Sequence, residues 1–239
     1  MKKTIWIIGC YGGIGKEISA HIRKKYDNVC LFDIVSPEQP KLSDKEAFFQ
    51  ADFSQRISVK EKCQLAAKSY GAPTDLVIAA GRVLSLDFDN TTDENIESLF
   101  NNNYMVVFNS LRFFFKYCNK SNDIEKSIVI ISSNAGNASR PNQIVYASIK
   151  AAINSLVRSL AKDWGKYNIR INAIAPGTII VPRNHESLIA KYPDFPNDYG
   201  RPLGKIMKPS NILPSCLFLL KSDNPITGQI ITVDGGSSL

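Results

Sequence analysis

The sequence has few of the residues that build metal centres or disulfide frameworks. Its only histidines, His21 and His185, lie far apart, and its five cysteines are an odd number with no Cys-x-x-Cys pair. Zinc sites and disulfide-rich secreted domains need closely spaced or paired ligands. We therefore expect reduced thiols and no metal site.

Long apolar runs are also missing. No stretch reaches the ~18 apolar residues that would suggest a membrane helix. The run Thr4–Ile8 follows two lysines, as in a signal peptide, but it is too short and leads into a glycine-rich turn instead of a small-residue cleavage site. These absences predict a cytoplasmic protein.

Acidic residues are fewer than basic ones, which gives a formal net charge of +7. The basic residues are scattered, and the densest run, Arg23-Lys24-Lys25, ends an amphipathic helical pattern where cations complement the helix dipole. No basic stripe with interleaved aromatics is present, so nucleic-acid binding is not expected. The charge indicates only a mild attraction for anionic ligands.

Short apolar runs alternate with helical patterns along the whole chain. Helical spacing is clearest in Ile14, Ile18 and Ile22 and in the stretch from 146 to 164. Continuous apolar runs are typical of parallel strands covered on both faces. The pattern predicts one α/β domain over residues 1–239, with a doubly wound parallel sheet between two helical layers. The expected strands are 4–8, 29–32, 48–51, 76–80, 127–131, 169–175 and 229–233.

The segment 181–209 has a different texture. It holds five prolines among aromatic and charged residues. A long irregular stretch inside a compact domain is usually functional. We expect a substrate loop or lid there.

A glycine-rich turn joins the first expected strand to the first expected helix. Glycines allow the backbone to turn sharply and to approach a phosphate, and the helix N-terminus then offers free N–H groups and a positive dipole. A tight turn alone would also use glycines, but the position between strand and helix favours a dinucleotide site. The expected contacts are Gly9, Tyr11, Gly12, Gly13, Ile14 and Gly15.

Asp33 closes the second expected strand, 18 residues after Gly15. A carboxylate there can accept hydrogen bonds from the adenosine ribose and repels a 2′-phosphate, so we predict NAD over NADP. Asp52, followed by Phe53, is expected near the adenine, although Asp52 also suits a helix cap. A plain turn residue is the competing interpretation for Asp33.

Tyr146 and Lys150 are four residues apart in a strongly helical segment, which places both side chains on one face. A free tyrosine, with a pKa near ~10, is a poor base, but an adjacent ammonium stabilises the phenolate. The pair then suits proton transfer near neutral pH. Alone it is an ordinary helix face; Ser132 and Ser133, at the end of an expected strand, strengthen the catalytic interpretation.

With these features the chain resembles a short-chain dehydrogenase/reductase of the single-domain, Rossmann-type class. In that family the catalytic serine precedes the tyrosine by 13 positions, which selects Ser133. Asn103 matches the family's helix asparagine, although Asn101 and Asn102 leave the register ambiguous. The segments 172–177 and 227–236 resemble the nicotinamide-lining stretch and the C-terminal strand and turn.

The resemblance implies a role for each residue. Tyr146 is the general acid/base, Ser133 polarises the substrate oxygen, and Lys150 lowers the pKa of the tyrosine and binds the nicotinamide ribose. Asn103 holds a water in the proton relay. Tyr146 and Lys150 also contact the cofactor, together with Ala80, Gly81, Pro176, Gly177 and Ile179. The family resemblance further implies a small-molecule substrate and a homo-oligomer, a tetramer or a dimer, joined through the helix after Asn101 and the Tyr146 helix.

Three departures from the family pattern concern the cofactor end. Ile8 replaces a threonine before the first glycine, and Ile78-Ala79-Ala80-Gly81 replaces an Asn-Asn-Ala-Gly turn. Val181 stands where a threonine often follows Pro-Gly, and Thr178 is a possible substitute. These changes leave the proton-transfer residues intact.

Alternatives remain open from the sequence. A non-catalytic dinucleotide sensor or scaffold would explain the altered 78–81 turn, whereas enoyl reduction fits poorly because such relatives space tyrosine and lysine more widely. The aromatic run 113–115 suits an interface or the core equally. The substrate is a secondary alcohol or ketone, and the loop polarity favours a hydroxylated or anionic one. The residues behind that preference are Arg82, Asn137, Arg140, Asn142, Arg183, His185 and Arg201.

Overall fold

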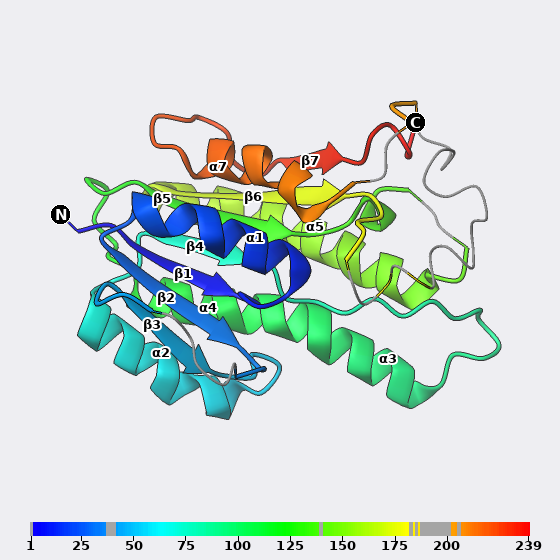
Figure 1. Ribbon diagram of the computed structural model, residues 1–239, viewed down its shortest axis with the longest axis horizontal. Helices are drawn as coiled ribbons and strands as arrows, with labels where there is room; N and C mark the ends of the chain where they lie inside the picture. The colour runs from blue at the N-terminus through cyan, green and yellow to red at the C-terminus, as the bar shows by residue number, and fades with distance from the viewer. Residues whose placement is uncertain are drawn as a thin grey trace.

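The computed structural model describes residues 2–36, 42–138, 141–181, 184, 186, 202–204 and 207–239. Within these residues the chain forms a three-layer arrangement with one sheet between helices (Figure 1). No helix in the described ranges is long and apolar enough to cross a membrane.

The sheet has seven strands in the order β3-β2-β1-β4-β5-β6-β7, and every neighbouring pair is parallel. The chain leaves β1 toward β2 and β3 on one side and returns beside β1 as β4 on the other. The switch in direction therefore falls between β1 and β4. The strands are β1 (Thr4–Ile8), β2 (Asn28–Asp33), β3 (Glu46–Gln50), β4 (Asp75–Ile78), β5 (Lys126–Ile131), β6 (Ile169–Pro176) and β7 (Ile230–Val233).

Helices cover both faces of the sheet (Figure 1). On one face α1 (Gly13–Ile22) and α7 (Leu213–Leu220) pack on the sheet. On the other face lie α2 (Arg56–Tyr70), α4 (Val106–Tyr117) and α5 (Ile144–Trp164). Helix α3 (Asp93–Phe100) leads into α4 through a π-helical segment, Asn101–Met105. The predicted doubly wound α/β fold is confirmed.

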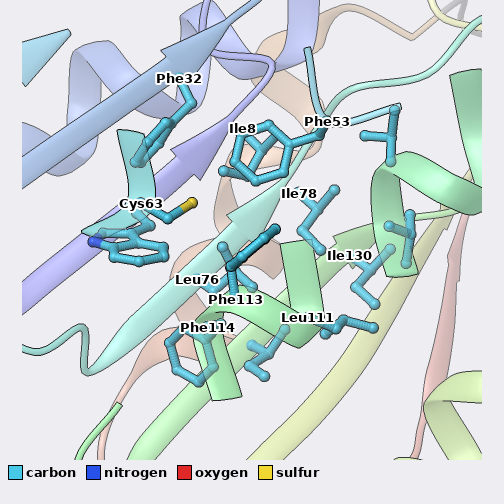
Figure 2. Close-up of a cluster of buried hydrophobic side chains, with 14 of the residues drawn as sticks. Ile8, Phe32, Phe53, Cys63, Leu76, Ile78, Leu111, Phe113, Phe114 and Ile130 are labelled. Atoms are coloured by element: carbon cyan, nitrogen blue, oxygen red, sulfur yellow. The ribbon is translucent and has the colours of Figure 1, made fainter. Parts of the chain in front are cut away.

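Alternate strand residues point into two separate cores. Trp6 and Ile8 of β1 face the α2, α4 and α5 layer, whereas Ile5 and Ile7 face α1 and α7. Figure 2 shows the first core, where Ile78 and Ile130 of neighbouring strands meet Leu111 of α4. Because both faces are buried, these strands need continuous apolar runs.

The aromatic run 113–115 belongs to the first core. Phe113 and Phe114 are buried, and Phe115 stacks on Trp164 of α5 with ring centroids 4.7 Å apart. Of the two interpretations left open by the sequence, the structure therefore shows the core.

Strand boundaries differ slightly from prediction. The fourth strand ends at Ile78 and not at Ala80. Ala79 N still donates to Ile8 O of β1 at 2.8 Å, and this is the last hydrogen bond between the two segments. The third strand begins at Glu46, two residues before the predicted start. The predicted lid, 181–209, lies largely outside the described residues.

Candidate active site

A cavity of about 760 Å³ opens at the carboxyl ends of the strands. It is lined by the residues that follow β1, β2, β4, β5 and β6 and by the first turns of α1 and α5. In doubly wound sheets ligands bind at this edge, where the strand order reverses. The position and the lining identify it as the candidate active site.

The glycine-rich turn forms one end of this cavity. Gly9 has a positive φ of 80°, and a Cβ at Gly9 would lie 2.6 Å from the backbone nitrogen of Ala80. The first helical hydrogen bond of α1 runs from Lys16 N to Gly12 O, 2.7 Å. The amides of Gly13 and Ile14 precede that bond and have no acceptor within the helix, and both residues line the cavity, which leaves these two amides available to an anion.

Two of these glycines are required by packing. A Cβ on Gly15 would overlap Gly9 O, and one on Gly13 would overlap the Val181 side chain. Gly15 is buried and does not line the cavity, whereas the other predicted residues of the turn do. Gly15 therefore acts by letting α1 approach the turn, and not by contact with a ligand.

Asp33 lies at the end of β2 and is fixed by two backbone amides. Its Oδ2 accepts from Tyr11 N at 2.8 Å, and its Oδ1 accepts from Val35 N at 3.2 Å. These two bonds hold the carboxyl group of Asp33 in place where it lines the cavity.

Asp52 and Phe53 line the same end of the cavity. Asp52 Oδ1 accepts from Ser54 N at 2.9 Å, so this carboxylate also braces its own turn. The N-cap residue of α2 is Gln55, so the interpretation of Asp52 as the helix cap is wrong. Tyr11 also lines the cavity, and its ring packs against Phe48 with the ring centroids 5.3 Å apart.

Tyr146 and Lys150 occupy the first two turns of α5. Tyr146 is half-buried and Lys150 is 3% exposed. The Lys150 ammonium lies 5.5 Å from the Tyr146 ring centroid and donates to Ile131 O at 3.4 Å. Burial lowers the pKa of Lys150 to about 8. Both side chains line the cavity, with the cation held close to the phenol ring.

The structure separates the two serines that follow β5. Ser132 is buried and donates to Asn154 Oδ1 at 2.6 Å. Ser133 is partly exposed, and its hydroxyl accepts from Ala135 N at 3.2 Å, which leaves its O–H free to donate. The environment of Ser133 therefore suits contact with a ligand oxygen.

Asn103 is completely buried inside the π-helical segment. Its Nδ2 donates to Arg82 O at 2.8 Å and to Leu99 O at 2.9 Å, and its Oδ1 accepts from Arg82 N at 3.3 Å. A Cβ on Gly81 would lie 2.9 Å from Asn103 Oδ1 and 3.5 Å from Lys150 Nζ, so both atoms flank one point. Asn103 thus packs beside Gly81 behind the wall, whereas Asn102 lines the cavity itself. π-helical segments often occur at functional sites.

The altered turn Ile78–Gly81 keeps a close backbone contact with the glycine-rich turn. Ala79, Ala80 and Gly81 all line the cavity, next to Gly9. The segment after β6 also lines the cavity, with Pro176, Gly177, Thr178, Ile179 and Val181.

The structure therefore brings nearly all predicted site residues to one cavity. The exceptions are Gly15 and Asn103, which support the wall from behind. Sequence reasoning missed several lining residues, although Ile34 and Val35 directly follow Asp33 and that adjacency was a usable signal. Further ones come from the starts of α1, α4 and α5, from the π-helical segment and from loops, and they include Lys16, Val83, Asn102, Val106, Asn134, Gln143 and Asn184.

Of the polar residues considered for the substrate, Arg82 lines the cavity. Asn137 instead accepts from Asn154 Nδ2 at 2.9 Å, and Asn142 holds a positive φ of 59° in the loop before α5. Arg140, Arg183, His185 and Arg201 lie outside the described residues.

Comparison with known proteins agrees with this geometry. A family model described as "Enoyl-(Acyl carrier protein) reductase" matches residues 9–238. A 3-oxoacyl-[acyl-carrier-protein] reductase from Thermotoga maritima is 29% identical over 98% of this chain and 97% of its own length.

Solved structures include both cofactor types. "ElxO with NADP Bound" superposes with a TM-score of 0.87 at 26% identity and 99% coverage of both chains. A short-chain dehydrogenase from Leptospira borgpetersenii with bound NAD+ has a TM-score of 0.88 at 26% identity, covering 100% of this chain and 94% of that one.

Proposed function

Because the chain belongs to the short-chain dehydrogenase/reductase family, we propose that it is an NAD(H)-dependent oxidoreductase that interconverts a secondary alcohol and a ketone. The observation that carries the proposal is the convergence of Ser133, Tyr146 and Lys150 on one cavity with the glycine-rich turn. When bound, the nicotinamide accepts or supplies the hydride.

The residues present fit such a cofactor. The free amides of Gly13 and Ile14 suit a pyrophosphate, and the Asp33 carboxylate suits ribose hydroxyls. The same carboxylate repels a 2′-phosphate, and Lys16 is the only cation lining that end within the described residues. These features favour NAD over NADP.

We assign proton transfer to Tyr146. In alcohol oxidation its phenolate takes the hydroxyl proton, and in ketone reduction its phenol returns a proton to the oxygen. The nearby Lys150 cation stabilises the phenolate, and the Ser133 O–H donates to the substrate oxygen. Asn103 positions the Arg82 backbone, next to Gly81 in the cavity wall. The four-residue spacing of Tyr146 and Lys150 favours carbonyl over enoyl reduction.

The decisive test is Tyr146→Phe, assayed against a panel of secondary alcohols and ketones with NAD(H). We expect kcat to fall by about 10²–10⁴-fold, the usual contribution of a general acid/base, with NADH affinity nearly unchanged. Tyr167→Phe is the matched control, because its ring packs on Phe115 away from the cavity. Absence of NADH binding to the parent protein by calorimetry would disprove the proposal.

A second outcome would support the non-catalytic alternative. NADH binding without turnover of any substrate, together with a cellular phenotype unaffected by Tyr146→Phe, would indicate a dinucleotide sensor. The altered turn Ile78–Gly81 motivates this alternative. The altered turn nevertheless packs closely against Gly9, so the change does not argue against cofactor binding.

We further propose that the substrate is polar and that the protein is a homo-oligomer. Arg82 and Gln143 line the same cavity as Tyr146 and favour a hydroxylated or anionic substrate. At the start of α4 and before it, Phe100 stacks on Tyr104 and Tyr104 on Phe108, and Phe100 remains 42% exposed. This aromatic ladder suits the expected interface after Asn101. Sedimentation velocity of Phe100→Ser would test it.

A further inference from the structure

A second cavity lies at the amino-terminal edge of the sheet, at the opposite ends of the strands from the candidate active site. Its volume is about 350 Å³. Its lining includes Thr4 at the start of β1, Asn28 at the start of β2 and Lys126 at the start of β5. Because all strands are parallel, this cavity is separated from the first by the length of the sheet.

Lys126 brings a buried charge to this cavity. The residue is 1% exposed, and its ammonium donates to Ser121 O at 2.8 Å. An ammonium has three N–H donors, so one bond leaves two of them available. Within the part of the chain that the structure describes, Lys126 forms no ion pair with a carboxylate. Burial also lowers the pKa of Lys126.

The cavity lining has one sign of charge. Its twelve residues include two lysines, Lys126 and the exposed Lys2, and no aspartate or glutamate. A buried cation without a counterion is costly, and an anion placed beside it relieves that cost. The lining therefore selects for a negatively charged group.

Part of the remaining wall is apolar. Pro73 is buried, and Tyr70 and Ile124 are partly buried. Two of the polar groups are already used within the protein: Thr4 Oγ1 and Asn28 Nδ2 each donate to Tyr70 O at 2.8 Å. Ligand pockets of this size combine apolar walls with a few polar groups that fix orientation.

From these observations we propose that the amino-edge cavity binds a small monocarboxylate with an apolar body. The carboxylate lies against the Lys126 ammonium, and the apolar body contacts Pro73 and Ile124. This site is independent of the proposed dehydrogenase activity, since none of its residues lines the candidate active site.

The test is isothermal titration of the full chain, saturated with NADH, with benzoate and with the isosteric uncharged benzamide. We expect benzoate to bind with one site and at least about 10-fold more tightly than benzamide, the usual value of a hydrogen-bonded charge. Lys126→Met should weaken benzoate binding by about 10-fold or more, whereas Lys126→Arg should retain it. Lys2→Met should weaken it only about two-fold, because exposed charges are screened.

The results also separate this site from the candidate active site. Lys126→Met should leave NADH affinity unchanged, and circular dichroism should show that the variant is folded. Equal binding of benzoate and benzamide, full benzoate affinity in Lys126→Met, or no binding to the parent chain would each overturn the proposal.

Discussion

The two edges of the sheet use their hydrogen-bonding groups in opposite ways. At the carboxyl edge the amides of Gly13 and Ile14, which line the cavity, have no acceptor within α1. At the amino edge side chains bond one another or the backbone: the single O–H of Thr74, for example, has two acceptors within reach, Thr4 O at 3.1 Å and Asp75 Oδ2 at 2.9 Å. The carboxyl edge is therefore open to a ligand, whereas hydrogen bonds at the amino edge join the starts of the strands to one another. Lys126 is the exception at the amino edge, because two of its N–H donors remain available.

Of all the substitutions considered, Gly15→Ala should disturb the structure of the carboxyl edge most. The added methyl group would overlap Gly9 O, so the glycine-rich turn must move away from α1. We expect NADH affinity to fall at least about 100-fold and unfolding free energy to fall by about 2 kcal/mol, as for overpacked sites. Calorimetry and urea unfolding would measure both changes.

The matched control for this change is Gly165→Ala. A Cβ at Gly165 meets nothing within 4 Å, so NADH affinity should stay within about two-fold of the parent. The unfolding free energy should change by no more than about 1 kcal/mol, the usual size of a glycine-to-alanine effect. Equal effects of the two substitutions would contradict the packing role of Gly15.

Lys150 gives the carboxyl edge a pH dependence. Burial lowers its pKa to about 8 from 10.5, so between these values the unfolded chain binds more protons than the folded one. The unfolding free energy of the apo protein should therefore rise from pH 8 to pH 10.5, by an amount on the order of 3 kcal/mol. Urea unfolding at the two pH values would measure it.

Lys150→Met should remove this dependence, and the exposed Lys162→Met, on the same helix, should preserve it. An identical pH slope in Lys150→Met and in the parent protein would show that the ammonium is not buried in solution.

Asp75 gives the amino edge the opposite dependence. Burial raises the pKa of Asp75 to about 6 from 3.8, so between these values the folded chain binds more protons. The unfolding free energy should fall as the pH rises from 4 to 6, by somewhat less than the Lys150 effect, roughly 2–3 kcal/mol.

Asp75→Asn should flatten that slope, whereas the exposed Asp163→Asn should not. The measurement is urea unfolding at closely spaced pH values. If Lys150 and Asp75 changed the unfolding free energy with pH in the same direction, the contrast between the two edges would be contradicted.

The smallest expected effect is on cofactor choice. Asp33→Ser removes the charge that faces a 2′-phosphate, so the ratio of kcat/KM for NADPH over NADH should rise by about 10-fold, or 1.4 kcal/mol. Asp52→Ser, at the same end of the cavity, should change the ratio much less because Asp52 also braces Ser54. Equal shifts would mean that Asp33 is not the discriminating carboxylate.

The sequence predicted the fold because local patterns dictate it. Continuous apolar runs such as Thr4–Ile8 can be buried only between two helical layers, and a glycine-rich turn followed by the Ile14, Ile18 and Ile22 stripe locates α1. The boundary of β4 was less predictable. Ala79 and Ala80 look like strand residues, and only their approach to Gly9 turns the chain.

The candidate site was likewise predictable where chemistry follows from spacing. Tyr146 and Lys150 share a helix face, and Asp33 ends a strand, so their types and positions are legible in the sequence. Ser133 needed a family resemblance to separate it from Ser132, and the structure then supplied the physical difference, the Ser132–Asn154 hydrogen bond.

The sequence by itself thus determined the order of elements, the glycine-rich turn and the residue types available for proton transfer. Only the tertiary structure decided that Gly15 and Asn103 support the site from behind its wall and that Gln143 and Asn102 line it. It also decided that Lys126 is buried beside an apolar cavity. The reason is physical: helical and strand periodicities are set by neighbours along the chain, whereas burial and the partners of a polar group depend on segments distant in sequence.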